Sequence, residues 1–374
     1  MNTDNISALA VGIAAVALIA GFGIYFNSPE LNATAGNSGE FVTTVSDDGK
    51  KIAIDKSQFR LAPELAGISN YINIDEFKLA DLKGKVVLVD FWTYSCINCI
   101  RTIPYLNAWH EKYADEGLVI VGIHAPEFDF EKNPQNVEAA VEKFGIKYPV
   151  VQDDEHDTWD AYQNRYWPRK YLVDDEGYIR YDHIGEGAYG ETEKVIQSLL
   201  KERAAVSGQA VAIDGSMVRP DAQSVDFGSI NTPELYFGYD FARAPLGNPE
   251  GFRPEQTVKY SIADDQEIKP NLIYLSGEWE NKADYMELKS GVGRIVLEYS
   301  ARSVNIVAGS AGTVYVSVDG KSPFARGADV GEDGTFAVDG QRLYNVASHK
   351  AYGEHRLIMD VVGEGFQIYT FTFG

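Results

Sequence analysis

The sequence predicts two folded domains: an α/β sandwich over residues 63–205 and an all-β sandwich over residues 233–374. A single membrane-spanning helix is expected ahead of them. In the first region apolar, strand-like runs alternate with helical patterns, whereas in the second the helical patterns nearly vanish. Near the N-terminus, residues 6–26 carry no charge. At 374 residues the chain is long enough to bury two separate cores.

The N-terminal segment predicts a membrane anchor over residues 1–30, followed by a polar tether over residues 31–62. About 20 apolar residues suffice to cross a bilayer as a helix. A cleaved signal peptide is the alternative, but it usually has a basic start and a shorter apolar core. Here the N-terminus carries only Asp4. We therefore favour an uncleaved anchor with the rest of the chain exported.

The first domain alternates strands and helices. Strands are expected at 71–74, 86–91, 118–123, 148–152, 170–173 and 178–183, and helices after Cys96 and at 136–144, 158–163 and 191–202. The continuous apolar character of the second and third strands is typical of buried parallel strands. A hairpin of the last two strands, followed by a helix, completes the predicted α/β sandwich.

The second domain follows a linker at residues 206–232, where periodicity is lost and Gly, Ser, Asp and Pro increase. Beyond it, strand patterns occur at 294–299, 313–318 and 366–371. Asp-Gly and Glu-Gly pairs separate such stretches as turns. Short strands with these turns predict an antiparallel sandwich of jelly-roll type.

Cys96 and Cys99 are the only cysteines, and they directly follow the apolar strand at 86–92. Two sulfurs two residues apart can close a small disulfide, and unpaired N–H groups at a helix start favour the thiolate of the first. A structural zinc site would need two more ligands at suitable spacing, and the six histidines do not offer them. A structural staple over so short a loop would stabilise little. The motif therefore favours redox use and predicts no metal.

The formal net charge of −22 argues against binding nucleic acid or anionic lipid headgroups. It says little about the fold. An acidic surface suited to solubility explains the charge most simply.

The residues around the cysteines carry a family resemblance. Residues 90–105 read Asp-Phe-Trp-Thr-Tyr-Ser-Cys-Ile-Asn-Cys-Ile-Arg-Thr-Ile-Pro-Tyr, and His-Ala-Pro-Glu-Phe at 124–128 and Arg-Tyr-Trp-Pro-Arg-Lys-Tyr-Leu at 165–172 follow. Together they resemble the extracytoplasmic thioredoxin-like domain of the DipZ type, related to the TlpA and ResA reductases. The resemblance continues to the C-terminus and implies a carbohydrate-binding-module-like shape for the second domain.

The resemblance implies roles for four catalytic residues. Cys96 attacks a substrate disulfide and Cys99 resolves the mixed disulfide, leaving the pair oxidised. Asp90 occupies the place of the buried carboxylate that takes the proton of the resolving thiol, although a solvated strand-end Asp is the simpler alternative. Pro168 is the expected cis-proline facing the disulfide. No further cofactor is expected.

Four further residues are expected to bind substrate or tune the thiols. Trp92 is expected to shield one side of the disulfide, with a plain core aromatic as the alternative. Trp167 precedes Pro168, in a place where thioredoxins usually have a smaller residue. His124 and Glu127 follow the end of the strand at 118–123, where function gathers in open α/β sheets. For Glu127, an ordinary surface acid is the alternative.

These features predict a membrane-anchored thiol–disulfide oxidoreductase with its soluble domains outside the cytoplasm. Its expected partners are extracytoplasmic proteins bearing thiols or disulfides, and a separate membrane electron donor or acceptor. The reductase direction is favoured, while the Ile-Asn centre of the motif leaves direction open.

Three alternatives remain. One is a surface protein whose β-sandwich binds glycan or protein, with aromatic candidates at Trp279, Tyr285, Tyr344 and Tyr352. The second is a thiol peroxidase, because Thr93 precedes Cys96 at the spacing of a Thr-x-x-Cys motif. The third is metal delivery through the dithiol.

Overall fold

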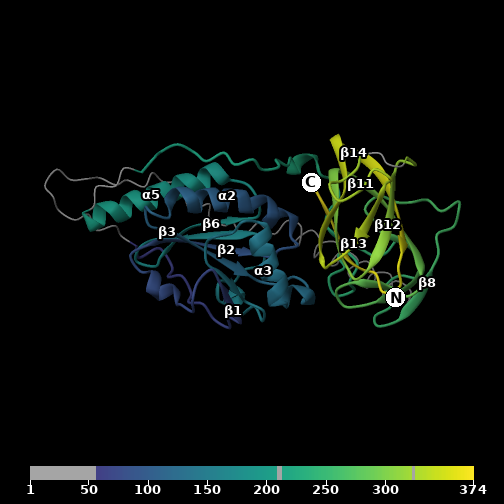
Figure 1. Cartoon of the computed structure of the whole chain (residues 1–374), viewed down its shortest axis with the longest axis horizontal. Helices are drawn as coiled ribbons and strands as arrows, with labels where there is room; N and C mark the ends of the chain where they lie inside the picture. Colours follow the sequence, from purple (N-terminus) through teal and green to yellow (C-terminus); the bar gives the residue numbers. More distant parts are fainter. Residues whose placement is uncertain (1–55, 209–212, 322–324) are drawn as a thin grey trace, which may run out of the picture. The chain divides into compact units, whose positions relative to one another are not determined.

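A six-stranded mixed sheet forms the centre of the first folded region, in the order β1-β4-β3-β2-β5-β6 (Figure 1). The structure is a computed structural model that describes residues 56–208, 213–321 and 325–374. The strands are β1 (Asn70–Ile72), β2 (Val86–Trp92), β3 (Leu118–His124), β4 (Val150–Gln152), β5 (Arg169–Val173) and β6 (Ile179–Ile184). Strand β2 pairs in parallel with β3 and antiparallel with β5.

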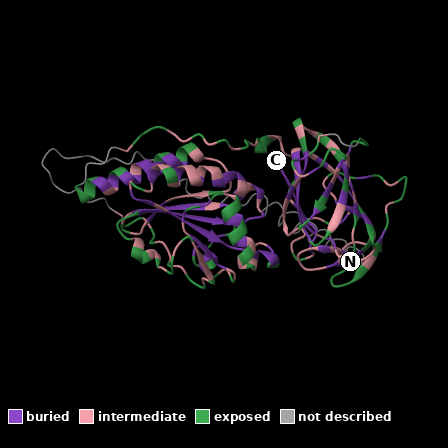
Figure 2. Ribbon diagram, in the orientation of Figure 1, coloured by how far each residue is buried: buried purple, intermediate pink, exposed green. Residues whose placement is uncertain are grey.

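Helices and short helical turns cover both faces of this sheet. They are α2 (Ile97–Tyr113), α3 (Pro134–Lys143), α4 (Asp157–Ala161) and α5 (Tyr189–Ser207), with 3-10 turns η1 (Leu79–Leu82) and η2 (Asp129–Lys132). Residues of α2, α3 and α5 share one core cluster, while α4 and η1 contribute to the core on the other face. Figure 2 shows the buried strands between these layers. The predicted α/β sandwich is confirmed.

Side chains alternate between the two faces of the sheet along β2, and this alternation determines the face on which Asp90 lies. Val86 and Leu88 pack in the cluster with α2, whereas Val87 and Val89 pack on the opposite face. Side chains at i and i+2 of a strand lie on the same face. Asp90 therefore lies on the α2 side, the side that carries Cys99.

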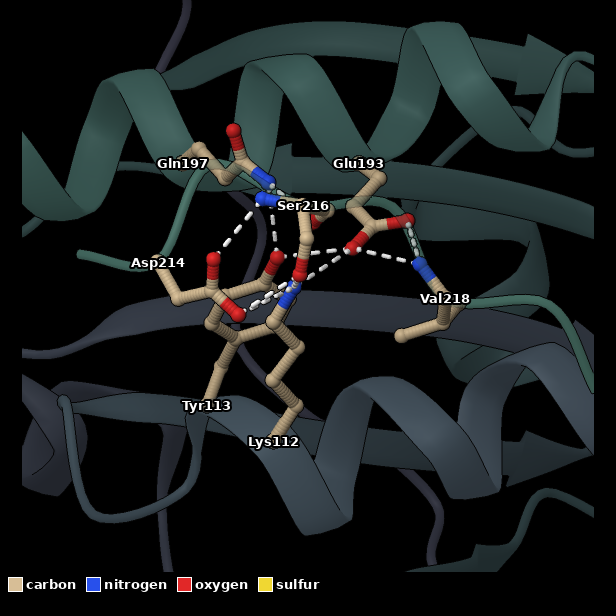
Figure 3. Close-up of polar contacts among 7 residues, drawn as sticks. All are labelled: Lys112, Tyr113, Glu193, Gln197, Asp214, Ser216 and Val218. Atoms are coloured by element: carbon tan, nitrogen blue, oxygen red, sulfur yellow. Dashed lines mark hydrogen bonds and ion pairs between the residues drawn. The ribbon is translucent and has the colours of Figure 1, made fainter.

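Residues 214–218 of the predicted linker pack against helices α2 and α5. Figure 3 shows residues 214–218 held between α2 and α5 by side chains of both. Glu193 accepts hydrogen bonds from the N–H of Val218 at 2.9 Å and from the hydroxyl of Tyr113 at 2.7 Å. Gln197 donates to the carbonyl of Ser216 at 3.1 Å. Because these buried groups satisfy one another, this stretch is part of the folded surface.

The second region is β-rich. Its strands are β7 (Leu235–Tyr236), β8 (Thr257–Tyr260), β9 (Tyr274–Asn281), β10 (Met286–Leu288), β11 (Val292–Gly309), β12 (Gly312–Val318), β13 (Thr335–Val338), β14 (Arg342–Val362) and β15 (Gln367–Phe373), with a 3-10 turn η3 (Phe227–Ser229) ahead of them. Long strands β11 and β14 pair antiparallel along most of their length. Strand β11 also pairs with β15 and β9, which are joined through β10, so these four strands close a ring. A β-rich domain is confirmed, and the jelly-roll type stays a prediction.

Among the described residues, no helix is long and apolar enough to cross a membrane. The predicted span at residues 6–26, the anchor at 1–30 and most of the tether at 31–62 lie outside the described residues.

Candidate active site

Cys96 is the residue that starts helix α2. Its backbone is extended, with φ −76° and ψ 115°, and its sulfur accepts a hydrogen bond from the N–H of Cys99 at 3.3 Å. An N–H donated at a helix start stabilises negative charge on the acceptor. Both thiols are free; Cys96 is half-buried, whereas Cys99 is 1% exposed. A partner can therefore reach the first sulfur, and the second is reachable only from Cys96.

Behind Cys99 lies a buried carboxyl group. Asp90 is 1% exposed, and burial raises its pKa to about 7, an increase that the nearby Lys170 limits. One carboxylate oxygen of Asp90, Oδ1, has no hydrogen-bond partner among the described residues. Burial, and then the neighbouring Cys96, raise the pKa of the Cys99 thiol well above its ordinary value, to which Asp90 also contributes. A thiol of this kind needs a base to react, and Asp90 is a group of suitable pKa beside it.

The Trp167–Pro168 peptide bond is cis, as the sequence predicted. The indole N–H of Trp167 donates to the carbonyl of Ala125 at 2.9 Å, which fixes the ring. Trp167 and Cys96 line the same cavity. Trp167 therefore lies where it can contact a partner at Cys96, and its role in binding substrate stays a prediction.

The cavity in front of Cys96 has a volume of about 400 Å³ and is lined from both folded regions. Glu127 and Trp167 line it on the first region, and Tyr236 and Phe373 line it on the β-rich region. Residues 57–374 form a single unit, in which the two regions contact each other directly. The site at Cys96 is therefore built by both.

Glu127 is joined to the β-rich region by a hydrogen bond. The hydroxyl of Tyr236 lies 2.7 Å from Oε1 of Glu127 and 3.2 Å from Oε2 of Glu234. Burial, and then the Glu234 carboxylate, raise the pKa of Glu127 to about 8. Burial also raises the pKa of Glu234. Because one hydroxyl has one proton to donate, a proton on one of the two carboxyl groups completes this cluster at neutral pH.

Trp92 and His124 do not line the cavity at Cys96. The predicted shielding of the disulfide by Trp92 and the predicted binding or tuning role of His124 stay predictions. Trp92 is 1% exposed and His124 is fully buried. The His124 ring stacks on Tyr94 with centroids 5.7 Å apart and meets Trp92 edge-on at 5.2 Å. Burial lowers the pKa of His124 to about 3, so the ring is neutral at physiological pH. Strand-end position indicated function here, but the ring packs into the core beneath the cysteine loop.

Two buried charges that the sequence analysis did not single out support the site. Glu131 accepts a hydrogen bond from the hydroxyl of Ser95 at 2.5 Å and another from the N–H of Glu127 at 2.6 Å, so it ties the cysteine loop to the loop after β3. Lys170 is fully buried and pairs in register with Asp90 across β2 and β5. No local signal in the sequence pointed to either residue, since Lys170 directly follows Arg169 at the start of its strand.

One group of carboxylates could in principle hold a metal ion. Among the described residues, ligand atoms of Asp174, Asp175 and Glu202 lie within 4.8 Å of one another. Arg180 already bonds Asp174 at 3.0 Å and Glu202 at 2.8 Å. The guanidinium therefore balances these acids, and none of them lines the cavity at Cys96.

Two family models match the chain. Residues 60–182 match the AhpC/TSA family, and residues 232–374 match the family described as the thioredoxin-like C-terminal domain. Protein DipZ of Mycobacterium tuberculosis is 35% identical over 322 residues, which cover 84% of this chain and 43% of DipZ. The alignment extends over both folded regions. The chain thus carries both matched domains in order and is similar to DipZ over 84% of its length.

Smaller relatives match less than half of the chain. The thiol-disulfide oxidoreductase ResA of Bacillus thuringiensis is 29% identical over 152 residues, 40% of this chain and 81% of ResA. A solved thiol-disulfide isomerase of Corynebacterium glutamicum is 26% identical, with a TM-score of 0.35, over 37% of this chain and 96% of its own. The chain spans less than half the length of the DipZ proteins, so their complete activity does not transfer to it directly.

Proposed function

We propose that the protein is a membrane-anchored thiol–disulfide oxidoreductase that acts outside the cytoplasm on cysteines of protein partners. The observation that carries this proposal is the asymmetry of the two sulfurs. Cys96 opens to a cavity at a helix start, and Cys99 is buried beside a carboxyl group whose pKa is about 7. One thiol is thus placed to attack a partner, and the other is placed to resolve the mixed disulfide.

In the half of the cycle that reduces a partner, the reacting groups of this chain are Cys96, Cys99 and Asp90. The Cys96 thiolate attacks a partner disulfide, forms a mixed disulfide and releases the first partner thiol, which takes a proton. Asp90 then removes the proton of Cys99, whose sulfur attacks Cys96 and releases the second partner thiol. Two electrons pass to the partner, and Cys96–Cys99 becomes a disulfide. The oxidase direction is the same path reversed.

The reductase direction is favoured, because the cysteine segment resembles that of the TlpA and ResA reductases. In the reductase direction, a separate membrane protein must return electrons to the Cys96–Cys99 disulfide.

Catalysed reduction of insulin by dithiothreitol tests the activity. The wild-type chain should accelerate insulin precipitation, and Cys96→Ser should abolish the effect. The equilibrium reduction potential of the couple then tests direction. A value near that of thioredoxin, about −270 mV, supports a reductase, and a value near that of DsbA, about −120 mV, supports an oxidase.

The alternatives receive less support. The Thr93 hydroxyl, which a peroxidase motif would use, lies 3.4 Å from Nε2 of His124 behind the cysteine loop. Of the aromatic candidates for a glycan site, Trp279 and Tyr344 are fully buried in the β-rich core. These two rings therefore cannot offer a face to a sugar.

A further inference from the structure

The rim of the cavity at Cys96 collects exposed apolar side chains. Eight large hydrophobic residues are exposed in the described chain, and three of them, Tyr166, Ile184 and Phe227, line this cavity. Their exposed fractions are 49%, 38% and 51%. Single exposed apolar residues are ordinary, but a group of them around a cavity marks an interaction site.

The β-rich region supplies a fixed wall of this cavity. Phe227 comes from η3, and Tyr236 from β7. The hydrogen bond to Glu127 holds Tyr236, and the guanidinium of Arg243 lies over its ring at 5.1 Å from the centroid. Tyr236 also meets the ring of Phe128 at 6.5 Å. Because contacts with the redox region hold this wall in place, its side chains can contact a partner that binds at Cys96.

The cavity lacks the acidic excess of the chain as a whole, which carries −22. Arg165 and Arg243 line it together with Glu127 and Glu234, and one of these two carboxyl groups holds a proton at neutral pH. The exposed apolar side chains of the rim, rather than charge, therefore indicate an occupant that is apolar around its reacting sulfur.

We propose that the β-rich region completes the substrate site, and that the substrate is an extended polypeptide whose reacting cysteine is flanked by apolar side chains that contact Phe227. This inference rests on the proposed function and names its substrate class. Phe227 is a specificity residue in this account, because its ring contacts the flank of the substrate and takes no part in the exchange.

The test compares three disulfides with the full chain recycled by dithiothreitol. Two are peptide dimers joined through a central cysteine, flanked in one by Leu and Phe and in the other by Ser. The third is 2-hydroxyethyl disulfide, which reports the chemistry alone. Phe227→Ser is compared with Tyr315→Ser, a matched change on β12 at a residue 49% exposed and away from the cavity.

We expect kcat/KM of the wild type to favour the apolar peptide by about tenfold, the effect of burying part of one aromatic side chain. Phe227→Ser should remove this preference through KM, while Tyr315→Ser retains it. All three proteins should reduce 2-hydroxyethyl disulfide at equal rates.

Equal rates of the wild type on both peptides, or equal loss in both variants, would overturn the inference while leaving the oxidoreductase intact. Rates per molecule that fall as enzyme concentration rises would overturn it too, because a second copy of the chain would then fill the cavity. Failure of the wild type on all three disulfides would instead contradict the proposed function.

Discussion

Asp90 on β2 and Lys170 on β5 are direct partners across an antiparallel pair of strands, and both are buried beside Cys99. Burial lowers the pKa of Lys170, and the neighbouring Asp90 and Cys99 oppose that decrease. The Nζ of Lys170 donates to the carbonyl of Gly185 at 3.0 Å. The resolving thiol thus lies beside a carboxyl group and an amine, and each of these two groups opposes the shift that burial causes in the pKa of the other.

Replacing Asp90 by Asn should slow resolution of the mixed disulfide. The amide cannot take the proton of Cys99, and a positioned general base contributes on the order of 10²-fold to such a step. Stopped-flow measurement of partner release should show this decrease, while the attack by Cys96 keeps its rate. Equal slowing of both steps would mean that Asp90 has a structural role only.

The same substitution should change how stability depends on pH. The pKa of Asp90 is about 7 in the folded protein against an ordinary 3.8, so the native state keeps a proton that the unfolded chain releases. The free energy of unfolding of the wild type therefore falls as pH rises from about 4 to about 7. Asp90→Asn has no carboxyl group to titrate at this position, so its free energy of unfolding does not fall in this way. Denaturant titrations at pH 4 and pH 8 should show the variant gaining up to about 4 kcal/mol relative to wild type.

Lys170→Met should shift the pH dependence of resolution upward. The ammonium group limits the increase in the pKa of Asp90, so its removal lets that pKa rise further. The midpoint of the pH–rate profile for partner release reports this shift. Arg169→Met is the matched control, because Arg169 is the neighbouring residue of β5 and pairs with Asp182 at 2.6 Å. A shift of equal size in the control would contradict the assignment.

Glu131→Ala should destabilise the fold by about 3 kcal/mol. The change leaves the hydroxyl of Ser95 and the N–H groups of Glu127 and Phe128 without their buried acceptor, each at a cost of about 1 kcal/mol or more. Glu138→Ala on the exposed face of α3 should stay within about 0.5 kcal/mol. Equilibrium unfolding in guanidinium chloride measures the change in the free energy of unfolding for both variants.

Local patterns in the sequence predicted much of the redox region. The apolar run of β2 and the cysteines that follow it predicted the strand and the helix start, because both depend on residues close in sequence. The buried carboxyl group at Asp90 followed from the family resemblance. The cis peptide at Pro168 followed from the family resemblance. Position at a strand end drew attention to His124, but the packing of its ring against Trp92 and Tyr94 depends on the fold and could not be read from that position.

Contacts between distant parts of the chain could not be predicted. Tyr236 and Glu127 are 109 positions apart, and neither residue type nor spacing indicates that they meet. The sequence analysis therefore assigned no role at Cys96 to the β-rich region. Strand registers across the sheet, such as Asp90 opposite Lys170, likewise became evident only in the folded chain.

Trapping of the mixed disulfide tests the central claim most directly. Cys99→Ser removes the resolving sulfur, so attack by Cys96 on a peptide disulfide should release one peptide as its thiol and leave the other attached as a mixed disulfide in equimolar amount. Peptide mapping by mass spectrometry should place the adduct on Cys96, and reduction should release it. Absence of an adduct from folded Cys99→Ser protein, with a reduced Cys96, would contradict the account.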